Sequence, residues 1–232
     1  MDLLRTAANA FIKLSAFEYR LVLSSGRNKP LDIIKINFIA QDLFHILGLQ
    51  HLLDIDLPRN KKILLEKISK GNITEDYISK SEFYKNGSLG YNIRERIAKA
   101  CYLEQYLDSD DFTVSVYKLK YHTQSIIRAD YLITCRRMDS DAEYYIFIRR
   151  RKENNTYGIV SCFPKRDITY WGGKRYLMLK EKKKGNISCV LFKHPNYVME
   201  QSFLKKQLED AEASIREEGT ISADDLEKEL GV

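Results

Sequence analysis

The feature that most constrains the fold of this sequence is a change of pattern near Asp108. Before it, apolar residues recur at helical spacing, as in the opening segment from Leu3 to Ser15. After it, the pattern is typical of short strands separated by turns. The predicted strands are 112–117, 126–135, 144–149, 158–163, 175–180 and 187–192. Helices followed by strands predict an α+β fold, with a helical N-terminal half packed on an antiparallel β-sheet.

The N-terminal half also contains one predicted hairpin. Segments 18–25 and 31–38 are rich in β-branched and aromatic residues and are separated by Gly26, Asn28 and Pro30. Further helices are predicted over 40–49, 61–70, 74–81 and, as one helix of four turns, 92–107. We expect two parts, an α+β domain over 1–197 and an acidic helical tail over 198–232.

Composition excludes several classes of protein. The chain is 44% hydrophobic and 30% charged, as in globular proteins, and has no run of about 18 apolar residues. We therefore expect a cytoplasmic protein with no membrane partner. The four cysteines lack zinc-site spacing, which predicts reduced, scattered thiols.

Charge is distributed unevenly along the sequence. The segment from Arg149 to Lys184 contains twelve basic and three acidic residues, a local charge of +9. The segment from Val198 onward carries a charge of −6. A basic segment interleaved with aromatics suits RNA, because cations bind phosphates and rings stack on unpaired bases. Lysine-rich strand edges that prevent aggregation are the alternative explanation. The predicted nucleic-acid contacts are Arg128, Arg149, Arg151, Lys165, Tyr170, Lys174 and Arg175.

No motif for a metal site, a phosphate-binding loop or an acyl-transfer nucleophile occurs in the sequence. We therefore expect no metal and no cofactor. His45 and His51 are six residues apart, a poor pair on one unbroken helix unless the chain turns at Gly48. His45 lies in an apolar segment, where a buried core histidine competes with a role in proton transfer.

RNA cleavage without a metal requires only a few kinds of group. A base takes the ribose 2′ proton, an acid protonates the leaving oxygen, and cations or hydroxyls stabilise the phosphorane. The sequence offers Lys80, Ser81, Arg96 and Ser161 for the last of these roles.

Several segments together resemble a known family, the phage-borne nuclease-like domains of the barnase, EndoU, colicin and RelE group, in its fourth phage class. The resemblance covers about 2–184 and is most specific around His45, the Lys80 and Ser81 pair, and the triplet that ends at Tyr131. The segments that carry it are 8–19, 42–53, 70–81, 93–107, 125–131, 161–164 and 167–180.

This resemblance implies a helical N-terminal part on an antiparallel sheet and a ribonuclease that needs no metal, encoded on mobile elements and toxin-like. It implies His45 as acid or base, Lys80 and Ser81 as phosphate holders and Arg96 as a supporting cation. Tyr131 would supply a hydroxyl from a strand, and Ser161 would be a ligand on the sheet face.

Two functions follow as hypotheses. The first is a metal-independent endoribonuclease that cleaves RNA by transesterification. The alternative is a catalytically inactive binding protein, an anti-defence or regulatory factor, that uses the same basic face for RNA or an acidic protein. A protein partner or self-association is also expected through the predicted helix over 198–217, where apolar residues repeat every three or four positions.

Overall fold

The structure is a computed structural model that describes residues 2–26, 29–85, 92–121, 125–137, 142–165 and 169–197. The chain divides into two compact units, Met1–Lys193 and His194–Val232. Within the second unit, the described residues contain one 3-10 helix, η3 (Pro195–Tyr197). The predicted acidic tail over 198–232 lies outside the described residues.

The described residues of the first unit contain α-helices, 3-10 helices and β-strands. The α-helices are α1 (Leu3–Leu14), α2 (Ala40–Ile46), α3 (Lys61–Ser69), α4 (Glu75–Ile78), α5 (Ile93–Ala100) and α6 (Leu103–Asp108). Two 3-10 helices are η1 (Leu49–His51) and η2 (Leu119–Tyr121). The strands are β1 (Glu18–Ser24), β2 (Leu31–Ile36), β3 (Phe112–Val116), β4 (Tyr131–Arg136), β5 (Glu143–Arg150), β6 (Tyr157–Pro164), β7 (Gly173–Lys184) and β8 (Ile187–Lys193).

The sheet closes on itself. Its strand order is β1-β2-β6-β5-β4-β3-β7-β8, and β1 pairs with β7 as well as with β2. Among the described residues, seven strands therefore form a closed barrel, and β8 extends it as a hairpin on β7. All of these pairings are antiparallel except that of β2 with β6, which is a single parallel bridge between Ile36 and Tyr157.

The predicted fold class is therefore wrong. A helical half does not lie on an open antiparallel sheet, because the N-terminal half itself contributes β1 and β2 to the barrel. The physical reason is that β7 is long enough to pair twice along one edge, with β3 near Arg175 and with β8 from Leu179 onward, while its other edge pairs with β1. Apolar patterning predicts that a segment is a strand, but not which strands it pairs with.

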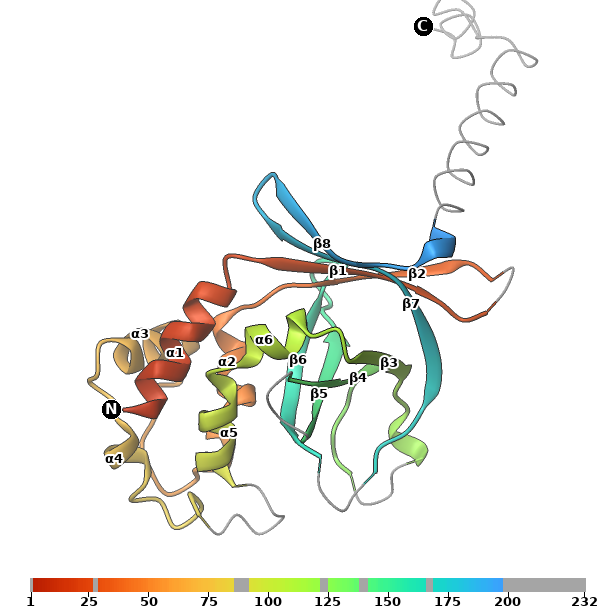
Figure 1. The fold of residues 1–232 in the computed structure, drawn as a ribbon. Coiled ribbons are helices and arrows are strands. Elements are labelled where there is room, and N and C mark those ends of the chain that lie inside the picture. The colour runs from red at the N-terminus through yellow and green to blue at the C-terminus, as the bar shows by residue number, and fades with distance from the viewer. Residues whose placement is uncertain are drawn as a thin grey trace, which may run out of the picture. The chain divides into compact units, whose positions relative to one another are not determined.

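The helices gather beside the strands, as Figure 1 shows for α1 to α5. Asp2 is the N-cap of helix α1, and its side chain accepts the backbone N–H of Arg5. The apolar stripe of α1 is buried. That stripe packs into one large core, which also includes Ile97 of α5 and Ile146 of β5. The long helix predicted over 92–107 is interrupted at Cys101 and Tyr102, so that α5 and α6 contribute separate buried faces to this core.

The two faces of β5 enter different environments. Tyr144, Ile146 and Ile148 belong to the large core, whereas Tyr145 and Phe147 belong to a smaller, mainly aromatic cluster. This alternation follows from the two-residue repeat of a strand. Among the residues that the structure describes, β6 has a strand neighbour on its second edge only near Tyr157, and helix α2 packs against β6. The end of β6 and helix α2 together position the candidate site.

Candidate functional site

Helix α2 is fixed at its N-terminus by Asp42. The Asp42 carboxylate accepts the backbone N–H of Ile39 at 2.9 Å, which caps the helix. The same oxygen accepts the Arg151 guanidinium at 2.6 Å. Burial raises the pKa of the Asp42 carboxyl, and the hydrogen bond from Arg151 opposes that rise. The pair therefore anchors α2 to the end of β5 and sets the position of His45 one turn further on.

His45 is a half-buried imidazole beside cations. Burial lowers its pKa below the ordinary value of 6.5, and the positive charges of Arg149 and Lys61 lower it further. Its Nε2 lies 2.9 Å from the side-chain nitrogen of Gln41, an exposed neighbour one turn earlier. An imidazole with a lowered pKa is neutral at pH 7 and can accept a proton.

Arg96 lies under the turn that follows α2. Its side chain is 2% exposed, and its Nη1 donates to the His45 carbonyl at 3.4 Å. The guanidinium also lies 5.3 Å from the centre of the Phe163 ring on β6. Gly48 permits this approach, because a Cβ added there would lie 3.1 Å from Arg96 Cδ. Its φ of +73° also favours glycine over residues with a side chain.

The turn at Gly48 brings His51 back toward His45. Helix α2 ends at Ile46, and His51 is the last residue of η1. Burial lowers the pKa of His51, and the charges of Arg96 and His45 lower it further. The two imidazoles thus interact electrostatically although they are six residues apart. Spacing on an unbroken helix argued against this pair, and Gly48 was the signal in the sequence that the chain turns.

Ser161 and Arg149 point to the same face of the barrel wall. Ser161 pairs with Phe147 across β5 and β6, and Arg149 is two residues beyond Phe147 on the same strand. Ser161 is 7% exposed, whereas Arg149 is exposed. Tyr131, in contrast, pairs with Ile148 and so lies on the opposite face. The structure therefore separates Tyr131 from Ser161.

The predicted phosphate holders Lys80 and Ser81 follow α4. The Ser81 hydroxyl donates to the Asp54 carboxylate, which also accepts the Glu82 N–H at 2.8 Å. The hydrogen bond from Ser81 lowers the pKa of Asp54. The Ser81 hydroxyl is thus already bound to an exposed carboxylate of the chain. Lys80 beside it is exposed.

The predicted nucleic-acid contacts differ in whether a carboxylate of the chain already binds them. Arg128, Arg149 and Lys174 are exposed. Arg128 lies in the loop before β4 and not on the strand predicted over 126–135. Ion pairs engage Arg151 with Asp42, Lys165 with Glu143, and Arg175 with Asp32. Tyr170 is half-buried and packs among the rings of Tyr117, Tyr145, Phe147 and Phe163.

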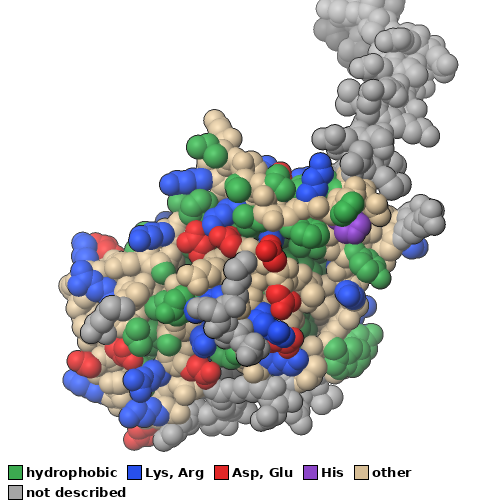
Figure 2. All heavy atoms as spheres, in the orientation of Figure 1, with side chains coloured by type: hydrophobic (Ala, Val, Ile, Leu, Met, Phe, Trp, Pro, Cys, Tyr) green, Lys and Arg blue, Asp and Glu red, His purple; other side chains and the backbone are tan. Residues whose placement is uncertain are grey.

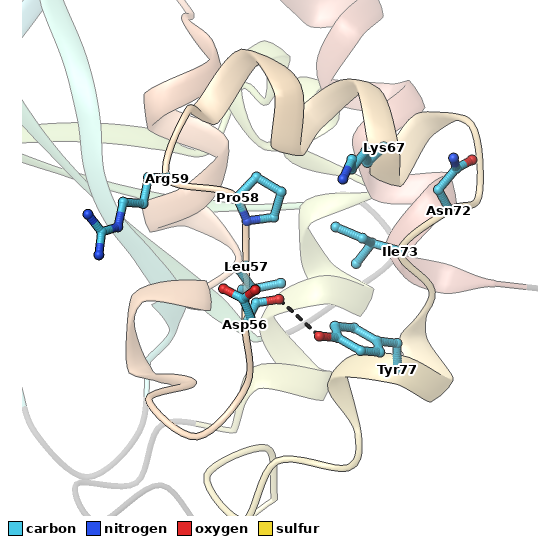
Figure 3. Close-up of a pocket in the computed structure, with 8 residues that line it drawn as sticks. All are labelled: Asp56, Leu57, Pro58, Arg59, Lys67, Asn72, Ile73 and Tyr77. Atoms are coloured by element: carbon cyan, nitrogen blue, oxygen red, sulfur yellow. Dashed lines mark hydrogen bonds between the residues drawn. The ribbon is translucent and has the colours of Figure 1, made fainter.

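Basic and acidic side chains are mixed on the surface. On the face shown in Figure 2, Lys and Arg side chains alternate with Asp and Glu side chains and form no continuous basic stripe. A hollow of about 540 Å³ lies near α3 and α4 (Figure 3), with the Tyr77 hydroxyl donating to the Asp56 carbonyl at 2.9 Å. Arg59 and Lys67 line it, and none of the predicted site residues does.

A model of one protein family matches most of the chain. The model of PBECR4, described as phage-Barnase-EndoU-ColicinE5/D-RelE like nuclease4, matches residues 3–207. The chain belongs to this family. The search of curated proteins found no match, and the search of solved structures found none either.

Membership of the PBECR4 family supports a nuclease-like function and a nucleic acid as substrate. Among the parts of this PBECR4 chain that the structure describes, no helix is both long and apolar enough to span a bilayer. The family match also extends to residue 207, past the last described residue, Tyr197. It therefore includes the first residues of the segment predicted as an acidic tail.

Proposed function

We propose that this protein cleaves RNA by transesterification without a metal, and that His45 transfers the proton. The observation that carries the proposal is the grouping of His45 with Lys61, Arg96 and Arg149. A half-buried neutral imidazole beside cations suits both parts of the reaction, since the ring accepts a proton and the cations attract the phosphate. The family match supports the nuclease class of this activity.

In the proposed reaction, the ribose 2′-hydroxyl takes the place of the Gln41 amide beside His45 Nε2. His45 accepts the 2′ proton while the 2′ oxygen attacks phosphorus. The bond from phosphorus to the 5′ oxygen then breaks, which leaves a 2′,3′-cyclic phosphate and a 5′-hydroxyl. The 5′ oxygen takes its proton from His51 or from water. Because a bound phosphate is negative, it raises the proton affinity of both rings, so that an imidazolium can act as the acid.

The cations have separate roles in this proposal. Arg149 is exposed and can contact a phosphate directly, whereas Arg96 is buried and holds the turn that carries both histidines. The Nζ of Lys61 lies 3.5 Å from the centre of the ring of Phe44, the residue before His45. Ser161 faces the same side as Arg149 and is proposed as a hydroxyl that donates to a phosphate oxygen.

The test is cleavage of end-labelled single-stranded RNA by the full-length protein in excess EDTA. We expect products that end in 2′,3′-cyclic phosphate, and we expect His45→Ala to lower the rate by at least 100-fold. Thermal unfolding of the variant shows whether it remains folded. Lys13→Ala, an exposed change on α1, is the control and should keep the wild-type rate. Intact RNA at high protein concentration would contradict the proposal.

One observation favours the alternative of a binding protein without turnover. The Ser81 hydroxyl and the side chains of Arg151, Lys165 and Arg175 are engaged with carboxylates of the chain itself. A protein that had lost cleavage and kept Arg149 and its neighbours would still bind RNA. In that case the logarithm of RNA affinity falls linearly with the logarithm of salt concentration, and Arg149→Gln makes this dependence less steep. His45→Ala leaves RNA affinity unchanged.

A further inference from the structure

A second hollow lies at the mouth of the barrel where β5 ends and β6 begins. Its volume is about 430 Å³, within the range of small-molecule sites. It is lined by three tyrosines and three charged residues, together with Val116: Tyr117, Tyr131, Tyr157, Lys118, Asp130 and Arg150. Arg150 and Tyr157 are direct partners across β5 and β6, which brings their side chains to one face.

The polar groups in this hollow are available to a ligand. Asp130 Oδ2 accepts the backbone N–H of Arg150 at 2.7 Å, which fixes the carboxylate at the rim. Within the described ranges, the ammonium of Lys118, the guanidinium of Arg150 and the hydroxyls of Tyr131 and Tyr157 have no hydrogen bond or ion pair to another residue. The hydroxyl of Tyr117, in contrast, donates to the Ser125 hydroxyl at 3.0 Å. Polar groups that converge on a concavity without protein partners are typical of a binding site.

The aromatic rings form the wall of the hollow. The rings of Tyr131 and Tyr157 are 5.8 Å apart at 69°, and both side chains are half-buried. Burial raises the pKa of Tyr131 to about 12, with a further rise from the negative charge of Asp32, so its hydroxyl stays protonated and can donate. A half-buried tyrosine face is a surface on which a nucleobase stacks.

We propose that this hollow binds a nucleoside monophosphate unit that carries guanine. The base stacks against Tyr157 and Tyr131, the phosphate contacts Arg150 and Lys118, and Asp130 reads the edge of the base. An ionised carboxylate only accepts hydrogen bonds. Guanine alone among the RNA bases presents two adjacent donors on its pairing edge, N1–H and the exocyclic amine, whereas adenine and cytosine place an acceptor beside their amine.

This site is separate from the proposed cleavage site. Tyr131 pairs with Ile148, and Arg149 is the next residue, whose side chain points to the other face of the same strand. The inference goes beyond the proposed function, because it concerns binding and requires no reaction at His45. The unit that binds is a free nucleotide or one nucleotide within a single strand, and the two sources are distinguished below.

The test is calorimetric titration of full-length protein carrying His45→Ala, which removes the proposed cleavage. The ligands are GMP, AMP, inorganic phosphate and the pentamers UUGUU and UUAUU. We expect GMP to bind at least tenfold more tightly than AMP. Tight binding of UUGUU over UUAUU with no binding of GMP assigns the site to a strand and also supports the proposal.

Two variants test the proposed contacts of Asp130 with the base and of Arg150 with the phosphate. Asp130→Asn keeps an acceptor for the Arg150 N–H, so the fold is retained, and it should bring the GMP and AMP affinities to within twofold. Arg150→Gln should weaken both nucleotides equally. Equal binding of guanine and adenine ligands by the unmodified site, a preference that survives Asp130→Asn, or inorganic phosphate binding as tightly as GMP would each overturn the proposal. These outcomes leave the cleavage assay untouched, because that assay uses a different residue and readout.

Discussion

Two groups of cations in the barrel unit have different surroundings. The β7 group, Arg175, Lys180 and Lys182, is bound internally: Arg175 to Asp32 at 3.3 Å and Lys182 to both Glu104 and Asp108 at 2.7 Å. Lys180 is fully buried and donates to the Leu107 carbonyl at 3.1 Å. These contacts connect β7 to β2 and to α6.

The α2 group consists of Lys61 and Arg149, whose charges act on the His45 imidazole, and Arg96, which contacts the His45 backbone. Lys61 and Arg96 lie over aromatic rings, and Arg96 also donates to a helix carbonyl. Across the described part of the chain, Lys61 and Arg149 form no ion pair with a carboxylate. The sum of charge along a sequence therefore does not distinguish cations that form ion pairs within the fold from cations that do not. The difference depends on which residues the fold places opposite each cation.

The largest expected effect is on the α2 group. Arg149→Gln should lower the cleavage rate constant by about 10- to 100-fold, because it removes a cation from the developing phosphate charge. Lys13→Gln is the matched control, since it removes the same charge from an exposed helix position. The measurement is kcat/KM on labelled RNA in EDTA. An equal loss in the two variants would mean that only net charge matters and would remove the distinction between the groups.

For the β7 group, the expected effect is on stability. Lys182→Met should lower the free energy of unfolding by about 2 kcal/mol, since it leaves Glu104 and Asp108 without their shared cation. Lys184→Met, at the exposed end of the same strand, should change it by less than about 0.5 kcal/mol. Urea unfolding gives both values. Similar losses would show that the ion pairs of Lys182 contribute nothing specific.

A glycine pair isolates the contact beneath His45. Gly48→Ala and Gly185→Ala both place a side chain at positive φ, which costs on the order of 1 kcal/mol each. Gly185 has open space around it, whereas a Cβ at Gly48 approaches Arg96. We therefore expect Gly48→Ala to cost about 1 kcal/mol more and to lower the cleavage rate as well. Equal costs in urea unfolding would show that Arg96 moves away freely.

The smallest expected effect is a change in titration. Burial and the charges of Arg149 and Lys61 hold the pKa of His45 below 6.5. As the pH rises, the ring therefore becomes neutral before pH 6.5 is reached. Removing the positive charge in Arg149→Gln should move the pKa upward, and the acid limb of the rate profile should move to higher pH with it. NMR of the imidazole C–H signals measures the shift, and Lys13→Gln should leave it in place. A downward shift would contradict the electrostatic account.

The same lowered pKa has a consequence for stability. The unfolded chain binds a proton at His45 near pH 6.5, and the folded protein binds it only at lower pH. The unfolded state therefore holds more protons in that interval, and the contribution of His45 to stability falls as pH decreases through it.

Much of the local structure was predictable from the sequence. The strands and the hairpin between Glu18 and Phe38 follow from β-branched and aromatic residues between turns, and they are confirmed within a few residues. The start of β4 differs, because residues 126–130 form a loop and pairing with β5 begins at Tyr131. The break of the long helix at Tyr102 was missed, because apolar spacing continues across it.

The candidate site was predictable only in part. The apolar segment around His45 and the glycine at 48 marked α2 and its turn, but Lys61, His51 and Asp42 acquire their roles from contacts far along the chain. The predicted role of Tyr131 came from the resemblance, and that of Ser81 came from the residue type as well as from the resemblance. The fold gives both residues other surroundings. Ser81 meets Asp54, and Tyr131 faces the mouth of the barrel.

The sequence by itself determined the family, the strand and helix segments and the uneven charge, because each depends on residues that are near one another along the chain. Tertiary structure alone decided that the sheet closes and which cations are neutralised. Both depend on pairings between distant segments, such as Leu21 with Lys180 and Arg175 with Asp32. A partner more than a hundred residues away leaves no local pattern, so its presence becomes visible only once the chain is folded.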